Sequence, residues 1–192
     1  MNLVKLLPLT FLLLLVMITS CDEPLAPKPR GYFRITLPKK SYTSYQPNGC
    51  PFHFDIPTYA TVVQDSADAA KCWMNIEFPD FKGTLYLSYK DVNNDLPQLI
   101  DDCRSLAMKH TAKASAIDES QFVNSENDVY GLNYKLKGSS ASPMQFWLTD
   151  STRHFVRASL YFYAVPNPDS IAPVQAFIED DLRQLIESFR WN

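Results

Sequence analysis

The sequence predicts an α+β domain in which helices pack on a largely antiparallel sheet. Several short segments alternate apolar and polar residues with a period of two, as half-buried strands do. Two longer segments repeat apolar residues at helical spacing. One helical segment lies between two groups of strands and the other lies at the end, an order that favours antiparallel pairing over alternating parallel units.

The first group of predicted strands precedes the first helix. Residues 31–37, Gly-Tyr-Phe-Arg-Ile-Thr-Leu, alternate apolar with polar side chains and stop at Pro38, so they predict the first strand. Further strands are expected at residues 50–56, 59–64, 72–78 and 84–90. In the last of these, Leu85 and Leu87 share one face, which we expect to be buried.

The remaining elements follow in the second half of the chain. An amphipathic helix is predicted over residues 96–114, with Pro97 in its first turn. Period two then returns in three strands, at residues 130–137, 144–148 and 154–163. Pro173 is expected to open a final helix whose apolar side extends to Phe189.

The N-terminus has the features of a bacterial lipoprotein precursor. Lys5 precedes an apolar run over residues 6–18, which is shorter than the roughly 20 residues that a membrane span requires. The run ends in Ile-Thr-Ser-Cys at 18–21, a lipobox. We therefore predict a signal peptide at residues 1–20 and lipidation of Cys21. The alternatives are an ordinary secretory peptide with a chance cysteine, or an uncleaved anchor helix.

A tether is predicted between the anchor and the globular domain. Residues 21–30 hold the acylated cysteine and three prolines, and at about 3.1 Å per residue they would span roughly 25 to 30 Å. One domain is then expected over residues 31–192. The acyl chains on Cys21 would hold it on a membrane of the cell envelope, facing the periplasm. The acidic residues after Cys21 do not indicate whether this is the inner or the outer membrane.

Three further cysteines allow at most one internal disulfide. Cys50 and Cys72 share the inward parity of their predicted strands, and an oxidising envelope favours a bridge between them. If the two strands were antiparallel neighbours in direct register, the cysteines would lie at opposite ends. An intervening strand at residues 59–64 would bring them to one end. Cys103, on an apolar helix face, is expected to be a buried free thiol.

Composition and motifs disfavour several function classes. The formal net charge is −3 and there is no basic stripe, so nucleic-acid binding has no electrostatic basis. No metal-ligand spacing, phosphate-binding loop or nucleophile elbow occurs, so we expect no metal, no cofactor and no catalytic residue. The acidic clusters at 101–102 and 179–181 are expected on solvated helix faces. The alternative is an envelope hydrolase or a peptidoglycan- or ligand-binding module, which requires a cleft near His53, His154 or the carboxylates.

Four sequence blocks stand out. They are Pro-Lys-Pro-Arg-Gly-Tyr-Phe-Arg-Ile-Thr-Leu-Pro at 27–38, Cys-Pro-Phe at 50–52, Cys-Trp-Met-Asn-Ile at 72–76 and Leu-Ser-Tyr-Lys at 87–90. With the lipobox, they resemble the gliding-motility lipoprotein GldD family of Bacteroidetes, whose members open with Pro-Arg-Gly-Tyr-Phe-Arg and carry Cys-Pro-Phe and Cys-Trp blocks. The resemblance runs across most of residues 21–190.

This resemblance implies a cell-envelope protein required for gliding motility and type IX protein secretion. It implies no established enzymatic activity or cofactor, and it suggests as partners other lipoproteins of the gliding or secretion machinery. The order of elements also resembles the α-β-α sandwich of the Mog1 and PsbP group, whose members usually bind partners. A fold alone does not assign a function.

The candidate interface consists of Tyr32, Arg34, Trp73 and Tyr89. Tyrosine, tryptophan and arginine dominate the binding energy of protein interfaces, which favours a docking role for these residues. The other interpretation is that the aromatic rings belong to the core or to a sheet face and that Arg34 pairs locally.

Overall fold

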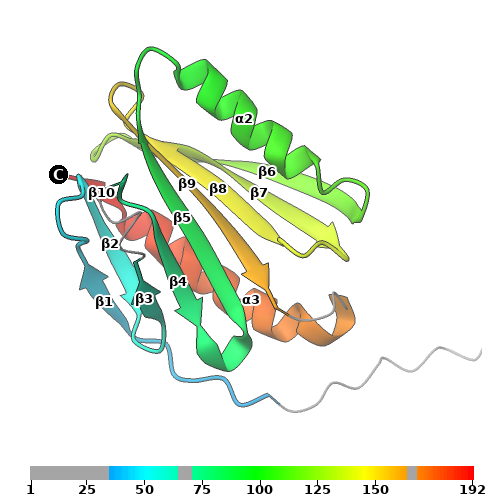
Figure 1. Cartoon of the computed structure of the whole chain (residues 1–192). Helices are drawn as coiled ribbons and strands as arrows, with labels where there is room; N and C mark the ends of the chain where they lie inside the picture. Colours follow the sequence, from blue (N-terminus) through cyan, green and yellow to red (C-terminus); the bar gives the residue numbers. More distant parts are fainter. Residues whose placement is uncertain (1–34, 65–70, 164–167) are drawn as a thin grey trace, which may run out of the picture. The chain divides into compact units, whose positions relative to one another are not determined.

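A computed structural model describes residues 35–64, 71–163 and 168–192, of which the side chains of residues 168–170 are not described. The predicted signal peptide, Cys21 and the tether therefore lie outside the described residues. The described part of the chain forms two antiparallel sheets and two α-helices (Figure 1). This confirms the predicted α+β class.

The large sheet has seven strands in the order β3-β4-β5-β9-β8-β7-β6, and every neighbouring pair is antiparallel. Its strands are β3 (Thr61–Val63), β4 (Met74–Phe78), β5 (Gly83–Asp91), β6 (Ala114–Asn124), β7 (Val129–Gly138), β8 (Met144–Thr149) and β9 (His154–Phe162). A short 3-10 helix, η2 (Pro79–Phe81), connects β4 to β5. The small sheet has the order β1-β2-β10, with β1 (Tyr42–Tyr45), β2 (Phe52–Pro57) and β10 (Arg190–Trp191).

The two helices, α2 (Leu96–Met108) and α3 (Pro168–Ser188), pack on opposite faces of the large sheet (Figure 1). Alternation along β9 shows this directly. Val156 belongs to the core cluster that holds Leu182 of α3, whereas the adjacent Phe155 packs with Leu99 of α2. Because successive side chains of a strand point to opposite faces, the sheet separates the two helices. Together they form an α-β-α sandwich.

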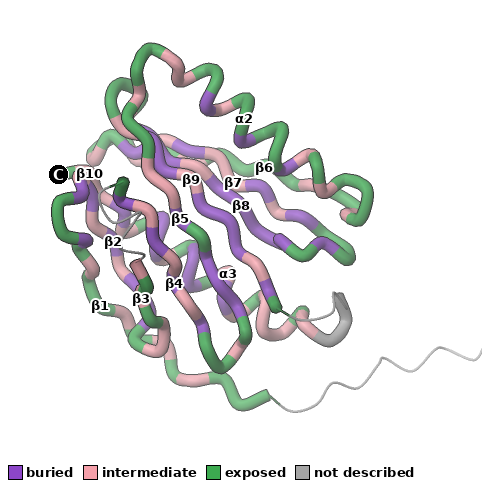
Figure 2. Tube along the Cα trace, viewed as in Figure 1, coloured by how far each residue is buried: buried purple, intermediate pink, exposed green. Residues whose placement is uncertain are grey.

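The main core lies between the large sheet, α3 and the small sheet. Buried and partly exposed positions alternate along β4, whereas most positions of the central strand β9 are buried, as Figure 2 shows. Phe52 and Phe54 of β2 stack with Phe189, which follows α3, at centroid distances of 5.5 and 6.0 Å. All three rings are fully buried, and each contributes about 1.5 to 3 kcal/mol by leaving water.

Three predicted elements were wrong in part: the first strand, the end of the first helix and the start of the last helix. Residues 35–37, the described part of the expected first strand, are exposed and form no strand, and β1 follows instead. The first helix ends at Met108, before the expected residue 114. The last helix starts at Pro168 rather than Pro173. Pro168 satisfies the preference for proline at the first helical position, so that Pro173 lies inside the helix.

Besides β1, two further strands that the sequence analysis did not predict complete the sheets. Most side chains of β6 are exposed on both faces, so this edge strand has no clear apolar alternation (Figure 2). β10 has two residues and is too short for a periodic signal. Both are held by backbone pairing, β6 with β7 and β10 with β2.

The acidic clusters of the two helices were expected on solvated faces, and Asp181 of α3 is the main exception. It is 1% exposed, and its carboxylate accepts hydrogen bonds from the hydroxyls of Tyr42, at 2.8 Å, and Tyr59. Lys40 Nζ lies 3.0 Å from the same carboxylate and also donates to the Phe177 carbonyl oxygen. A buried carboxylate is tolerated only when it is paired and hydrogen-bonded, and these three donors meet that requirement. The expectation of a solvated face was therefore wrong at Asp181.

Removing the Asp181 charge should destabilise the domain. Asp181→Asn would leave Lys40 without its closest anion and two partly buried hydroxyls without a carboxylate. We expect a loss of about 3 kcal/mol in the free energy of unfolding, measured by guanidinium chloride titration. Asp180→Asn is the matched control because its side chain is 52% exposed, and it should cost under about 1 kcal/mol. Equal losses in the two variants would contradict the assigned role of Asp181.

The same contacts predict the sign of the alkaline pH dependence. Burial and the bond to Asp181 raise the pKa of both Tyr42 and Tyr59. The contribution of the two protonated tyrosines to the free energy of unfolding is complete below about pH 10, the ordinary tyrosine pKa. It is lost as the pH rises above this value, because the tyrosines of the unfolded chain lose their protons first. The unfolding free energy should fall above pH 10. It should fall less steeply in a Tyr42→Phe, Tyr59→Phe double variant.

A disulfide joins Cys50 and Cys72, with the two Cα atoms 5.7 Å apart. It connects the chain entering β2 of the small sheet with the chain entering β4 of the large sheet. The two strands belong to different sheets, so the register objection does not arise. The strand between them, β3, pairs with β4. Cys103 is buried and free. Burial raises the pKa of its thiol to about 11 and outweighs the opposite effect of the nearby Arg157 guanidinium.

Opening this disulfide should destabilise the domain measurably. The bridge spans 22 residues, and a loop of this size stabilises by about 3 kcal/mol in the chain-entropy model. A Cys50→Ser, Cys72→Ser double variant should lose that amount in denaturant unfolding. In the unreduced wild-type lipoprotein, maleimide at pH 8 should label Cys103 slowly when folded and rapidly when unfolded. Labelling of Cys50 or Cys72 without reductant would contradict the bridge.

Candidate functional site

The candidate interface predicted from the sequence is only partly described by the structure. Tyr32 and Arg34 lie outside the described residues. Trp73 and Tyr89 come together beside the disulfide, where the Trp73 indole Nε1 donates to the Tyr89 carbonyl oxygen at 2.9 Å. Both side chains are partly exposed, and the Lys71 ammonium lies 5.0 Å from the centre of the Trp73 ring. The two described members of the predicted patch are therefore neighbours.

A groove of about 780 Å³ opens at this point. Its lining combines aromatic rings, charged side chains and the disulfide. The lining residues are Gly49, Pro51, Lys71, Cys72, Trp73, Tyr89, Lys90, Asp91, Asn93, Asp95, Leu99 and His154. Both signs of charge are present, so the groove suits a partner with mixed polar and apolar groups rather than a strongly charged one.

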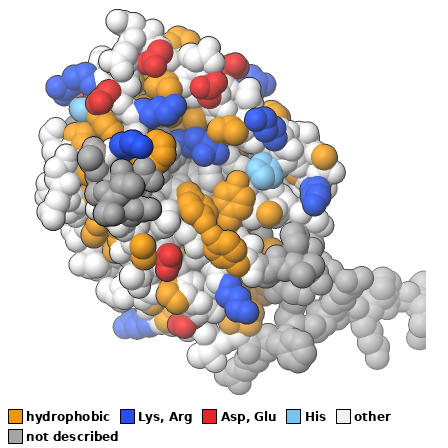
Figure 3. Space-filling view, viewed as in Figure 1, with side chains coloured by type: hydrophobic (Ala, Val, Ile, Leu, Met, Phe, Trp, Pro, Cys, Tyr) orange, Lys and Arg blue, Asp and Glu red, His pale blue; other side chains and the backbone are white. Residues whose placement is uncertain are grey.

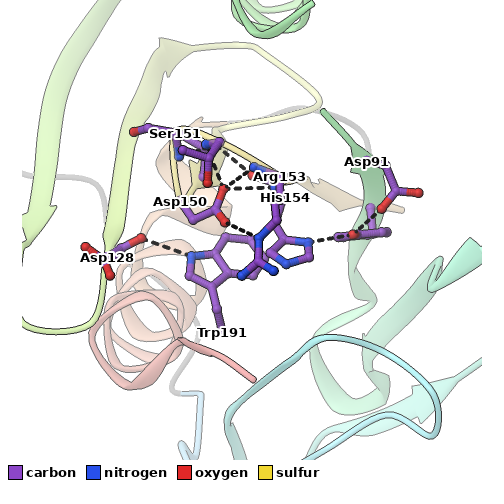
Figure 4. Close-up of polar contacts among 10 residues, drawn as sticks. Asp91, Asp128, Asp150, Ser151, Arg153, His154 and Trp191 are labelled. Atoms are coloured by element: carbon purple, nitrogen blue, oxygen red, sulfur yellow. Dashed lines mark hydrogen bonds and ion pairs between the residues drawn. The ribbon is translucent and has the colours of Figure 1, made fainter. Parts of the chain in front are cut away.

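His154, which starts β9, lies at the centre of a hydrogen-bond chain. The Tyr89 hydroxyl donates to Asp91 Oδ1 at 2.6 Å and lies 2.7 Å from His154 Nδ1 (Figure 4). Because the tyrosine has one hydroxyl proton and the carboxylate only accepts, the Nδ1–H of His154 donates to the tyrosine oxygen. Burial, and then the bond to Asp91, raise the pKa of Tyr89. The tyrosine therefore stays protonated and fixes the imidazole.

Trp191, the last residue of β10, covers the other side of this imidazole (Figure 4). The two rings stack with centroids 5.3 Å apart and an angle of 23° between their planes. The Trp191 indole Nε1 donates to the carbonyl oxygen of Asp128, in the turn between β6 and β7, at 3.1 Å. Trp191 also contacts the buried Phe189 edge-on. The C-terminal strand thus attaches the small sheet to the end of the large sheet.

Asp150 orders the turn between β8 and β9 that carries His154. Its Oδ1 accepts the backbone N–H groups of Thr152, Arg153 and His154 at 2.8 to 2.9 Å (Figure 4). Burial alone would raise the pKa of Asp150, but these backbone hydrogen bonds outweigh it and the pKa is lowered. The carboxylate is therefore ionised at neutral pH and acts as a fixed acceptor.

A second groove, of about 710 Å³, lies beside Trp191 and is more polar. Its lining residues are His53, Asn127, Asp128, Asp150, Thr152, Arg153, Arg190, Trp191 and Asn192. His154 lines the first groove and Trp191 lines the second. The rings of these two residues stack, so the two grooves are neighbours. We call Trp73, Tyr89, His154 and Trp191, with the adjacent Arg153, the His154 surface.

Asp150 and Tyr89, the two groups that fix His154 and its turn, are poorly tuned for acid–base chemistry at neutral pH. The envelope-hydrolase alternative required a cleft near His53 or His154, and the described residues provide one. However, the pKa of Asp150 is lowered and that of Tyr89 is raised, so both move away from the neutral range that a general acid or base needs. No cluster of three potential metal ligands occurs among the described residues.

Sequence reasoning missed three members of this surface. His154, Trp191 and Arg153 were not grouped with Trp73 and Tyr89. No sequence pattern connects these residues, since Trp73 and Trp191 lie far apart along the chain. Only the pairing of β10 with β2 and of β5 with β9 brings them together.

Comparisons with known proteins complete the description. Among solved structures, the chain is similar to cyanobacterial PsbP from Synechocystis sp. PCC 6803, with 10% identity, 88% of this chain and 100% of that chain covered, and a TM-score of 0.48. No curated protein matches. In the described part of the chain, no helix has the length and apolar character needed to cross a membrane.

The family model described as "Gliding motility lipoprotein GldD" matches residues 22–191. Since this match covers nearly the whole sequence, the chain belongs to the gliding motility lipoprotein GldD family, whose lipoprotein character associates it with the cell envelope.

Proposed function

We propose that this lipoprotein is a non-catalytic scaffold or stabilising component of the gliding and type IX secretion machinery. It is anchored through Cys21, faces the periplasm and binds another envelope lipoprotein through the His154 surface. Membership of the GldD family supports the link to motility. The lipobox supports the anchor. The protein contact is supported by the arrangement of aromatic side chains.

The observation that carries the proposal is a set of partly exposed aromatic rings in fixed positions. Trp73 is held by its bond to the Tyr89 carbonyl, and Trp191 is held by its bond to the Asp128 carbonyl. His154 is fixed between Tyr89 and Trp191. Side chains that are already ordered lose little conformational entropy on binding, so more of their contact energy appears as affinity. Large rings of this kind are typical hot spots.

Charged side chains border these rings and favour a specific partner orientation. Arg153 is 75% exposed, and its nearest carboxylate, Asp150, is 3.8 Å away. Such a contact is weak, so the guanidinium keeps donors for a partner carboxylate. Rim charges of this kind govern association rate and orientation more than final affinity.

The lipid anchor strengthens the argument for a modest interface. Anchoring confines two partners to the same layer beside the membrane and raises their effective concentration without any new contact. A small patch of aromatic and arginine side chains is then sufficient for stable association. This arrangement fits a component that stabilises its neighbours.

Changes in the His154 surface should abolish function without lowering the protein level. Trp73→Ala removes a hot-spot ring and should cost about 2 kcal/mol or more of binding. Arg153→Glu reverses an exposed rim charge and should leave the fold intact. We expect both variants to lose colony spreading, type IX secretion and chemical crosslinking to the partner, while immunoblots show normal amounts of protein.

Tyr163→Ala is the matched control, because Tyr163 is an exposed aromatic residue outside this surface. It should leave spreading, secretion and crosslinking unchanged. If Arg153→Glu behaves as wild type and Trp73→Ala loses function only in proportion to its protein level, the interface lies elsewhere. Turnover of an envelope substrate such as peptidoglycan by the full chain, lost in His154→Gln together with motility, would overturn the non-catalytic claim.

A further inference from the structure

A second candidate site lies on the face of the large sheet that carries α2. Two hollows, of about 250 and 490 Å³, open there. They are adjacent, because Ser88, Lys90, Leu106 and Arg157 line both. The helix covers β8 and β9, and the hollows extend from its edge over β5 and β4. In Figure 3, hydrophobic side chains gather near the middle of this view with lysine and arginine side chains beside them.

The groove formed by the two hollows combines an apolar lining with an excess of positive charge. Its apolar side chains are Val63, Trp73, Tyr86, Leu99, Leu106 and Phe155. Lys90, Lys109 and Arg157 are its cations, and Asp102 is its only carboxylate among the described residues. An apolar groove with an excess of positive charge is complementary to an amphiphile that carries an anionic head group.

Arg157 lacks an anionic partner. Its Nη2 donates to Gln145 Oε1 at 2.9 Å, and no carboxylate of the described residues lies within 4.0 Å of its guanidinium. Arginine carries five N–H donors in a planar fork that matches a carboxylate. This partly buried guanidinium meets neutral groups here, the Gln145 oxygen and the Cys103 side chain, and it retains donors for a ligand.

Gln145 contacts Arg157 but lines neither hollow, and it determines how the guanidinium is held. Its side chain is 2% exposed, and its Nε2 has no hydrogen-bond partner among the described residues. Rotating the amide by 180° would turn its N–H donors toward Arg157, so Oε1 must face the guanidinium. Ser159, the register partner of Gln145 on β9, has an unpartnered buried hydroxyl as well. Each buried donor without a partner costs roughly 1 to 3 kcal/mol, so folding stability alone does not favour these polar residues beside the arginine.

We propose that this groove binds an amphiphile with a carboxylate head group, of the fatty-acid class. The carboxylate accepts hydrogen bonds from Arg157, which lines both hollows, with Lys90 and Lys109 at the rim. The acyl chain lies over β5 and β4 against Leu106 and Trp73. This inference rests on its own observations and not on the proposed function, although Trp73 and Lys90 also line the groove beside the disulfide.

The test is a calorimetric titration of the full lipidated chain in a non-ionic detergent, with matched detergent in the reference titration. The probes are decanoate, decanol and acetate, which separate the head group from the chain. Decanoate should bind at least about tenfold more tightly than decanol, because a charge-assisted bond to arginine contributes a kcal/mol or more. Acetate should show no measurable binding, since it buries no chain.

Two variants probe the head-group end and the chain end separately. Gln145→Glu places a carboxylate of nearly the same shape beside Arg157, so it should weaken decanoate binding about tenfold or more without lowering the thermal midpoint. Leu106→Trp enlarges a partly exposed side chain that lines both hollows, and it should block decanoate sterically. Val123→Trp, on exposed β6, is the matched control and should bind decanoate as wild type does.

Equal affinities for decanoate and decanol would refute recognition of the head group. Decanoate binding that survives both Gln145→Glu and Leu106→Trp would place the amphiphile elsewhere on the protein. Heat changes that also occur without protein would show partition into detergent only, and that result too would overturn the proposal. Because neither variant alters Tyr89, His154 or Trp191, a failure here is distinguishable from a failure of the proposed function.

Discussion

The buried carboxylate of Asp181 is the constraint on which the arrangement of the described layers depends. It lies on α3 and receives hydrogen bonds from Tyr42 of β1, from Tyr59 after β2 and from Lys40 before β1. A charge so deeply buried is stable only if all its donors stay in place, so α3 cannot move independently of the small sheet. The polar contact fixes the position of the layers, and the stacked phenylalanines between them supply most of the stabilisation.

This constraint also determines where the His154 surface forms. With α3 fixed against β2, the chain leaving the helix enters β10, pairs with β2 and places Trp191 on the imidazole of His154. The pairing of β4 with β5 places Trp73 at the end of β5, and the disulfide attaches this start of β4 to the chain that enters β2. Segments from both ends of the domain sequence thus meet on rigid elements. A site built in this way is ordered before a partner arrives, which is the property that a binding surface needs.

The sequence was sufficient where one face of an element is buried and the other is not. The alternation in β4 and in the middle of β5 and the helical spacing around Leu99 follow directly from that asymmetry. It failed at β6, whose two faces are both largely exposed, and at Asp181, whose helix position looks solvated. The partners of Asp181 lie more than a hundred residues away along the chain, and no local pattern encodes such contacts. For the same reason, no sequence pattern grouped His154 and Trp191 with Trp73 and Tyr89, which were predicted to belong to one patch.

The buried polar groups on the two faces of the large sheet are hydrogen-bonded to different degrees. On the α3 side, nearly every buried position is apolar, and Asp181, the buried charge there, is fully paired. On the α2 side, Gln145 and Ser159 retain buried polar atoms without partners among the described residues, next to an arginine without a carboxylate. Stability alone would favour apolar side chains at these positions, because unpaired donors in a low-dielectric interior are costly. The α3 face therefore contributes most of the stability of the domain, whereas the α2 face keeps polar groups next to Arg157, where we propose a ligand-binding groove.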